Sequence, residues 1–116
     1  MTSIDVTYLR GADRERASAM PFSVLPLGSV EYHGDHAPFG TDTTLAEGFA
    51  ERLAERRDCL LFPPVFYSFV PRLTRDHGPA ASVAPDRYLA YLVDVLRGLA
   101  AFGPRRILVV NGHSEN

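Results

Sequence analysis

The chain has 116 residues, of which 46% are hydrophobic, so it is long enough for one domain with a modest core. A formal net charge of −2 argues against nucleic acid or an anionic membrane as a partner. A single cysteine, the lack of a signal-peptide core and the lack of a membrane-length apolar run lead us to expect a cytoplasmic protein.

The first predicted strand follows a lead-in of about twenty residues that is irregular or partly helical. Residues 22–27 are apolar except for Ser23 and are followed by Gly28-Ser29, which predicts a strand. Pro26 has no backbone N–H, so this strand should be an edge strand or be broken there. Residues 28–42 contain four Gly or Pro and predict a loop that leaves the strand's carboxyl end.

A helix is predicted over residues 43–57, with Asp42 or Thr43 as its cap and leucine and phenylalanine at fourfold spacing on one face. Residues 59–62 predict a second short strand, in which Cys59 should be a buried, inert thiol. Residues 65–84 then form a long loop, and loops of this length are usually functional or disordered.

The strongest helix pattern begins at Pro85 and runs to Phe102, where Gly103-Pro104 stops it. Residues 107–110 are all apolar, which is typical of a strand covered on both faces. Strands that alternate with helices of this length predict an α/β fold with right-handed crossovers and a parallel sheet.

Five potential metal ligands follow the ends of the first and last of these strands. Glu31 and His33 form one pair, His113 and Glu115 form the other, and Asp42 ends the first loop. Residues at i and i+2 of an extended segment face the same side, and ligands bind beyond the carboxyl ends of parallel strands. We therefore expect these side chains to meet, although about eighty residues separate the two clusters.

The chemistry of this set suits Zn²⁺ or Mn²⁺, because it combines carboxylates and imidazoles without a thiolate. Five ligands exceed the need of one catalytic zinc and suit two ions that share a bridging carboxylate. Taken singly, each residue has a plainer interpretation as a loop residue, a hydrogen-bonded histidine or a helix cap. His36 is a weaker candidate, either as a partner of the ligands or as an exposed side chain, and His77 is a weaker candidate for lining the pocket or steering substrate.

Two sequence motifs resemble those of the creatininase (creatinine amidohydrolase) family. The first is Leu25-Pro26-Leu27-Gly28-Ser29-Val30-Glu31-Tyr32-His33-Gly34 followed by Phe39-Gly40-Thr41-Asp42, and the second is Asn111-Gly112-His113-Ser114-Glu115-Asn116. The similarity runs from about Phe22 to the last residue.

This resemblance implies a three-layer α/β/α fold with a central, mainly parallel sheet and two divalent metal ions, Zn²⁺ and/or Mn²⁺. Glu31, Asp42 and His113 would hold one ion, and His33, Asp42 and Glu115 the other, with Asp42 as the bridge. The implied activity is metal-dependent hydrolysis of a small cyclic or linear amide, and the implied assembly is a homo-oligomer.

The sequence departs from the family in two respects. Members are longer, and their C-terminal half supplies a catalytic histidine, so we expect residues 1–116 to be a single creatininase-like domain without that half. His77-Gly78-Pro79-Ala80 also stands where members have an FPGT-like stretch, and Asp35 where they have proline. The alternatives are a non-catalytic metal-binding or oligomerisation module, or an inactive fragment; exposed apolar surface on residues 85–102 and on the last strand would indicate a missing half.

Overall fold

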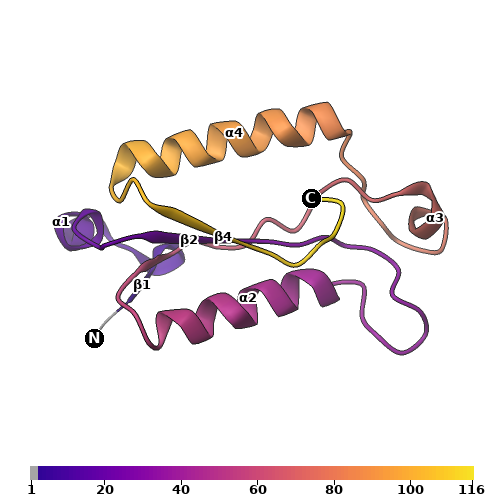
Figure 1. The fold of residues 1–116 in the computed structure, drawn as a ribbon, viewed down its shortest axis with the longest axis horizontal. Helices are drawn as coiled ribbons and strands as arrows, with labels where there is room; N and C mark the ends of the chain where they lie inside the picture. Colours follow the sequence, from indigo (N-terminus) through magenta and orange to yellow (C-terminus); the bar gives the residue numbers. More distant parts are fainter. Residues whose placement is uncertain (1–2) are drawn as a thin grey trace.

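The computed structural model describes residues 3–116 and consists of one parallel sheet between two long helices (Figure 1). The sheet has the strand order β1-β3-β2-β4, and every pairing is parallel. The strands are β1 (Ile4–Asp5), β2 (Ser23–Leu27), β3 (Leu60–Leu61) and β4 (Ile107–Asn111). The helices are η1 (Val6–Tyr8), η2 (Gly11–Asp13), α1 (Arg14–Ser18), α2 (Thr41–Ala54), α3 (Arg72–Arg75) and α4 (Pro85–Phe102).

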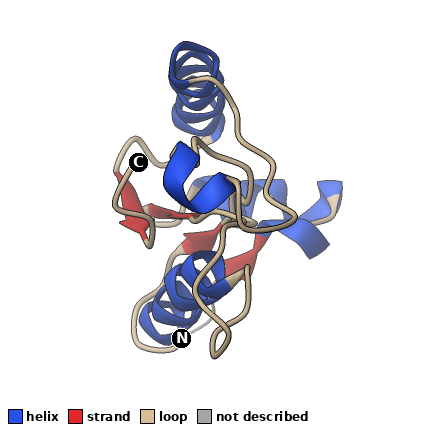
Figure 2. Ribbon diagram, turned by 90° about the vertical axis from the view of Figure 1, so that its right-hand side faces the viewer, coloured by secondary structure: helices blue, strands red, loops and turns tan. Residues whose placement is uncertain are grey.

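The predicted α/β class with a parallel sheet is confirmed, and α2 and α4 cover opposite faces of the sheet (Figures 1 and 2). The lead-in contributes one strand that the sequence did not indicate, since Ile4 of β1 pairs with Leu60 of β3. The loop predicted over residues 65–84 contains the short helix α3.

The position of β2 corrects part of the prediction made for Pro26. β2 lies between β3 and β4 and is therefore a central strand, so the edge assignment was wrong. The pairing of β2 with β3 ends at Val24 and Leu61, before Pro26. Beyond Pro26, β2 pairs on the same side only through the isolated bridge between Leu27 and Val65. The missing N–H therefore falls where the neighbouring strand has already ended.

The start of α2 also differs from the prediction. The helix begins at Thr41 and ends at Ala54, and its N-cap is Gly40, which makes no side-chain capping bond. Asp42 and Thr43 lie in the first turn and direct their oxygens at Ser29, beyond the end of β2, so they are not caps. The polar groups that suggested a cap thus join the helix to the sheet edge.

The core lies mainly between the sheet and α2. Val24, Ala50 and Cys59 are fully buried in one cluster, and Ile4, Ala17 and Leu60 form a second one under the lead-in. The expectation that Cys59 is buried is confirmed. No helix among residues 3–116 is long and apolar enough to cross a membrane.

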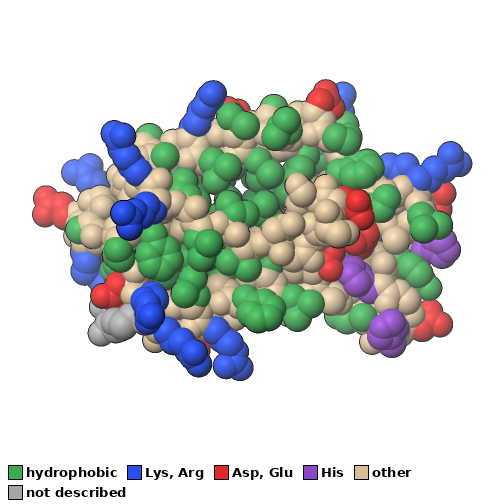
Figure 3. Space-filling view, in the orientation of Figure 1, with side chains coloured by type: hydrophobic (Ala, Val, Ile, Leu, Met, Phe, Trp, Pro, Cys, Tyr) green, Lys and Arg blue, Asp and Glu red, His purple; other side chains and the backbone are tan. Residues whose placement is uncertain are grey.

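The α4 side of the sheet and its outer edge at β4 are much less covered, and together we call them the α4–β4 surface. Its exposed apolar side chains lie on both elements: Leu89, Tyr91, Phe102, Leu108 and Val109. Figure 3 shows hydrophobic side chains on and beneath α4. β4 has the composition of a strand covered on both faces, but Leu108 is 46% exposed, because no further element among residues 3–116 packs there.

Candidate metal centre

The site forms where the first turn of α2 meets the ends of β2 and β4. The approach is close at two glycines, since a Cβ at Gly28 would overlap Thr43 and a Cβ at Gly112 would overlap the backbone carbonyl of Asp42. Ser29 donates its N–H to Thr43 Oγ1 (3.0 Å) and its hydroxyl to Asp42 Oδ2 (2.9 Å). The small residues in both motifs thus allow the helix to bring Asp42 to the sheet edge.

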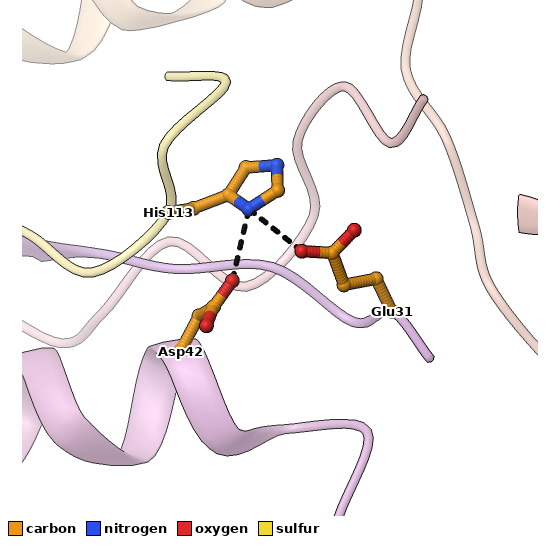
Figure 4. Close-up of side chains that lie close together, drawn as sticks. All are labelled: Glu31, Asp42 and His113. Carbon is orange, nitrogen blue, oxygen red and sulfur yellow. Dashed lines mark hydrogen bonds and ion pairs between the residues drawn. The ribbon is translucent and has the colours of Figure 1, made fainter. Parts of the chain in front are cut away.

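Three side chains from distant parts of the chain converge at this edge (Figure 4). His113 Nδ1 lies 2.9 Å from Asp42 Oδ2 and 3.0 Å from Glu31 Oε1. All three residues are buried, and His113 is only 1% exposed. One ligand atom from each lies within 4.8 Å of the others, which is the arrangement expected around a metal ion.

The second nitrogen of His113 is held by a backbone carbonyl. Nε2 lies 2.9 Å from the backbone oxygen of Phe69, which can only accept, so Nε2 carries the proton and donates. The other nitrogen, Nδ1, then faces two carboxylate oxygens. A cation is needed where these three atoms meet in a buried position, and it is either a second proton on the ring or a divalent metal ion, which this donor set fits.

His33 repeats the same arrangement on the other side of Asp42. Its Nδ1 donates to the backbone oxygen of Glu31 (2.9 Å), which leaves Nε2 to face Asp42 Oδ1 at 2.9 Å. Each carboxylate oxygen of Asp42 therefore faces one imidazole nitrogen, and each imidazole is held from behind by a backbone carbonyl. Such outer hydrogen bonds fix the tautomer and orientation of histidine ligands.

The ionisation of the two central groups reflects this network. Burial works to raise the pKa of Asp42, but hydrogen bonds from Ser29, His33 and His113 outweigh it and lower the pKa below the usual 3.8. Burial works to lower the pKa of His33, but its bonds to the Glu31 carbonyl and to Asp42 raise it above 6.5. Asp42 also lies in the first turn of α2, where the helix dipole favours a negative charge.

The structure brings together four of the five predicted ligands: Glu31, His33, Asp42 and His113. Glu115 lies apart, because its side chain is exposed and accepts a hydrogen bond from the Ser114 hydroxyl at 2.9 Å. Its role as a ligand stays a prediction. His36 and His77 are also exposed, although His77 stacks on Tyr32.

Sequence reasoning missed three groups that support the ligands. Ser29 lies inside the first motif, and its hydroxyl could have been considered on that ground. The carbonyl of Phe69 and the hydroxyl of Thr74, which donates to Glu31 Oε2 at 2.8 Å, come from the long loop. No local pattern marks either of them, since their role depends on how that loop folds back over the site.

The fold and the site define an α/β protein with a centre of carboxylates and imidazoles at the carboxyl edge of a parallel sheet. The family model for creatininase, described as creatinine amidohydrolase, matches residues 9–116. The chain therefore belongs to the creatininase family.

Curated relatives include two hydrolases. A 3-dehydro-scyllo-inosose hydrolase of Thermotoga maritima is 32% identical over 88% of this chain and 33% of its own length. A creatinine amidohydrolase of Pseudomonas putida is 33% identical over 80% of this chain and 37% of its own length. The chain thus spans little more than a third of these two relatives.

Solved structures agree with the fold over the whole chain. A creatinine amidohydrolase (creatininase) matches 100% of this chain and 47% of its own chain, with 29% identity and a TM-score of 0.84. A manganese form of creatininase, also 29% identical, matches 99% of this chain and 47% of its own with a TM-score of 0.82. A variant described as Zn–Zn type, 28% identical, matches 100% and 47% with a TM-score of 0.81.

Proposed function

We propose that this chain is the metal-binding part of a creatininase-type hydrolase that cleaves a small cyclic or linear amide. The observation that carries this proposal is the position of Asp42, whose two oxygens each face one ring nitrogen of a different histidine. A carboxylate placed in this way is suited to bridge two cations. Relatives named as hydrolases, and neighbours named as manganese and zinc forms, support the same class of chemistry.

Glu31, Asp42 and His113 would hold one divalent ion, because their ligand atoms already lie within 4.8 Å of one another. His33 and the second oxygen of Asp42 would hold the other, and Glu115 would complete it after a movement of its exposed side chain. Such ions, when bound, supply Lewis-acid polarisation of an amide carbonyl and activate water near neutral pH.

The chain's own residues would keep the ligands ready for this chemistry. The carbonyls of Glu31 and Phe69 accept from one nitrogen of each imidazole and so hold the other nitrogen toward Asp42. Ser29 donates to Asp42 and so keeps the carboxylate ionised despite its burial. The site is thereby organised before a metal or substrate arrives, which is the condition for efficient electrostatic stabilisation.

The remaining requirements of an amidohydrolase are a proton donor for the leaving amine and walls for the substrate. We infer that another segment of polypeptide supplies both and packs on the α4–β4 surface. Leu89, 64% exposed, and Leu108, 46% exposed, give that surface the apolar character of an interface. Solved neighbours have about twice the length of this chain, which is consistent with a covering segment of similar size, and further copies in a homo-oligomer would extend the contact.

The first test is the metal content of the purified chain. The chain is dialysed against excess Zn²⁺ or Mn²⁺ and then against metal-free buffer, and bound metal is measured by elemental analysis. We expect about two ions per chain, the number for which a bridging carboxylate is suited. One ion per chain would contradict the bridge, and no retained metal would contradict the proposed function.

Two variants make the result specific to the bridge. Asp42→Ala removes the shared carboxylate and should abolish retention of both ions, whereas Asp35→Ala removes an exposed carboxylate of the same loop and should leave retention unchanged. Retention of both ions by Asp42→Ala would contradict the binuclear arrangement. Bound metal without hydrolysis of small amides would instead favour a non-catalytic metal-binding module, if the result is the same when the further polypeptide that covers the α4–β4 surface is present.

A further inference from the structure

One segment outside the two motifs holds two of the three converging ligands, and we call residues 66–83 the strap. The backbone oxygen of Phe69 accepts from His113 Nε2 at 2.9 Å, and the hydroxyl of Thr74 donates to Glu31 Oε2 at 2.8 Å. Neither group is itself a ligand. Both act on the side of the ligand that points away from the shared centre.

The strap is fixed at its base by its own hydrogen bonds. Ser82 Oγ accepts from the N–H of Val70 at 2.9 Å and lies 3.2 Å from the Val70 oxygen, while Val83 donates to the Ser68 oxygen at 2.9 Å. Val70 is fully buried. These contacts determine where the Phe69 carbonyl points, because Phe69 lies between two anchored residues.

The far end of the strap is held by aromatic contacts with the loop that carries Glu31. His77 stacks on Tyr32, with ring centroids 4.9 Å apart and an interplanar angle of 23°. Gly78, with φ of 152°, lies so close to Phe39 that an added Cβ would be 2.7 Å from its ring. Thr74 lies between the two anchored ends, so its hydroxyl has a defined position relative to Glu31.

The Thr74 hydroxyl has one proton and two acceptors within reach. Glu31 Oε2 is at 2.8 Å and the Pro71 oxygen at 3.2 Å. The shorter bond goes to the carboxylate, and hydrogen bonds to ionised acceptors are about twice as strong as neutral ones. With Oε2 occupied in this way, the other oxygen of Glu31 faces His113 Nδ1 at 3.0 Å.

We propose that Thr74 is a positioning residue, whose hydroxyl occupies Oε2 of Glu31 and leaves Oε1 facing His113, where it would be available to a metal ion. This inference rests on the proposed metal-binding function and names a residue that neither sequence motif contains. Loss of such an outer hydrogen bond typically lowers metal affinity 10- to 100-fold.

The test compares the Zn²⁺ affinity of four chains by competition with a chromogenic chelator. Thr74→Val keeps the shape but removes the hydroxyl, and it should weaken binding about tenfold or more. Thr74→Ser restores the hydroxyl and should bind within about threefold of the parent, which a loss due only to packing at the methyl group would not do. Thr7→Val, at an exposed threonine of η1, should have no effect.

The same chains loaded with Co²⁺ give a second measurement. A changed orientation of Glu31 should alter the visible absorption of the cobalt chain in Thr74→Val and leave it unaltered in Thr74→Ser. Equal zinc affinity and an unaltered spectrum in Thr74→Val would overturn the proposal. Equal losses in the valine and serine variants would overturn it as well.

A metal-free measurement separates this inference from the proposed function. Thr74→Val, Glu31→Gln and the double variant are unfolded in urea in the presence of a chelator. If the hydroxyl and the carboxylate are coupled, the shifts in the unfolding midpoint should be non-additive. Additive shifts would overturn the positioning role even if the chain binds metal, and non-additive shifts would support it even if the parent chain retains none.

Discussion

The carboxyl edge of the sheet and the α4–β4 surface are built from neighbouring strands but differ in how far their interactions are satisfied. At the edge, the two oxygens of Asp42 have three hydrogen-bond partners. On the α4 side, the buried hydroxyl of Tyr88 has no hydrogen-bond partner among residues 3–116. Burial, and to a lesser degree the nearby Tyr91, raises the pKa of Tyr88 to about 12. Tyr88 also lines a cleft of about 510 Å³ between α4 and residues 64–67.

This difference supports the proposals made above, that the metal centre forms within the chain and that a further segment covers the α4–β4 surface. Buried polar groups are normally satisfied, and large apolar patches on soluble proteins normally mark contacts. The ligand geometry should therefore depend on internal packing near β2, β4 and α2, and little on α4. The following predictions test this contrast, from the largest expected effect to the smallest.

The largest effect should come from truncating a leucine in the core rather than one on the α4–β4 surface. Leu60 is 0% exposed and Leu89 is 64% exposed. Leu60→Ala should lower the free energy of unfolding by about 3 kcal/mol through lost burial and a cavity. Leu89→Ala should change it by less than about 0.5 kcal/mol. Urea denaturation of the metal-free chain measures both values.

Equal destabilisation of the isolated chain by Leu89→Ala and Leu60→Ala would contradict the difference between the buried core and the uncovered α4–β4 surface. That result would mean that the α4–β4 surface is already covered in solution, for example by self-association. Repeating the denaturation at several protein concentrations distinguishes the cases, because only an associated chain shows a stability that depends on concentration.

A smaller effect should follow from adding a single methyl group where α2 meets β4. In Gly112→Ala the new Cβ would overlap the Asp42 carbonyl, and the helix or strand end must move. Such overpacking costs about 2 kcal/mol, and it should also weaken zinc retention because Asp42 moves with its helix. Gly48→Ala, on α2 with no atom within 4 Å of the added Cβ, is the matched control. It should stabilise the chain by about 0.5 to 1 kcal/mol, since alanine is the better helix former.

The sequence predicted the sheet edge well, because local patterns determine it. Apolar runs located β2 and β4, and the rule that ligands follow the carboxyl ends of parallel strands brought Glu31 and His113 together across the chain. The exact start of α2 was missed, because Ser29 competes for the polar side chains of Asp42 and Thr43, a contact between residues thirteen and fourteen positions apart.

The contacts of the strap with the ligands and the strand β1 were not predicted, for related physical reasons. Thr74 contacts Glu31 across 43 positions, and no periodicity records such a pairing. β1 has two residues, too few to show alternation, and it exists because Ile4 can pair with Leu60 in the finished sheet. The exposure of Leu108 differs from a strand covered on both faces but agrees with the exposed last strand that would indicate a missing half, because an apolar run shows that a strand is suited to burial and not which segment buries it.

The smallest effect should be electrostatic and concerns two carboxyl groups on one helix. Hydrogen bonds lower the pKa of Asp42, whereas burial, and then the charges of Glu51 and Asp5, raise the pKa of Glu47 above its usual 4.5. A carboxyl group with a raised folded-state pKa releases its proton first in the unfolded chain. Glu47 therefore costs stability once pH rises through 4.5 and the folded value, and the cost is complete above both.

Glu47→Gln should accordingly stabilise the chain by about 0.5 kcal/mol at pH 7 and have no such benefit at pH 3, where both states are protonated. Glu55→Gln, at the exposed end of α2, controls for the loss of a charge and should change stability little at either pH. Urea denaturation at the two pH values measures the difference. A benefit of equal size at pH 3 would show that packing rather than charge is responsible. It would then contradict the contrast between Asp42, whose charge is stabilised by hydrogen bonds, and Glu47, whose charge is destabilised by burial on the same helix.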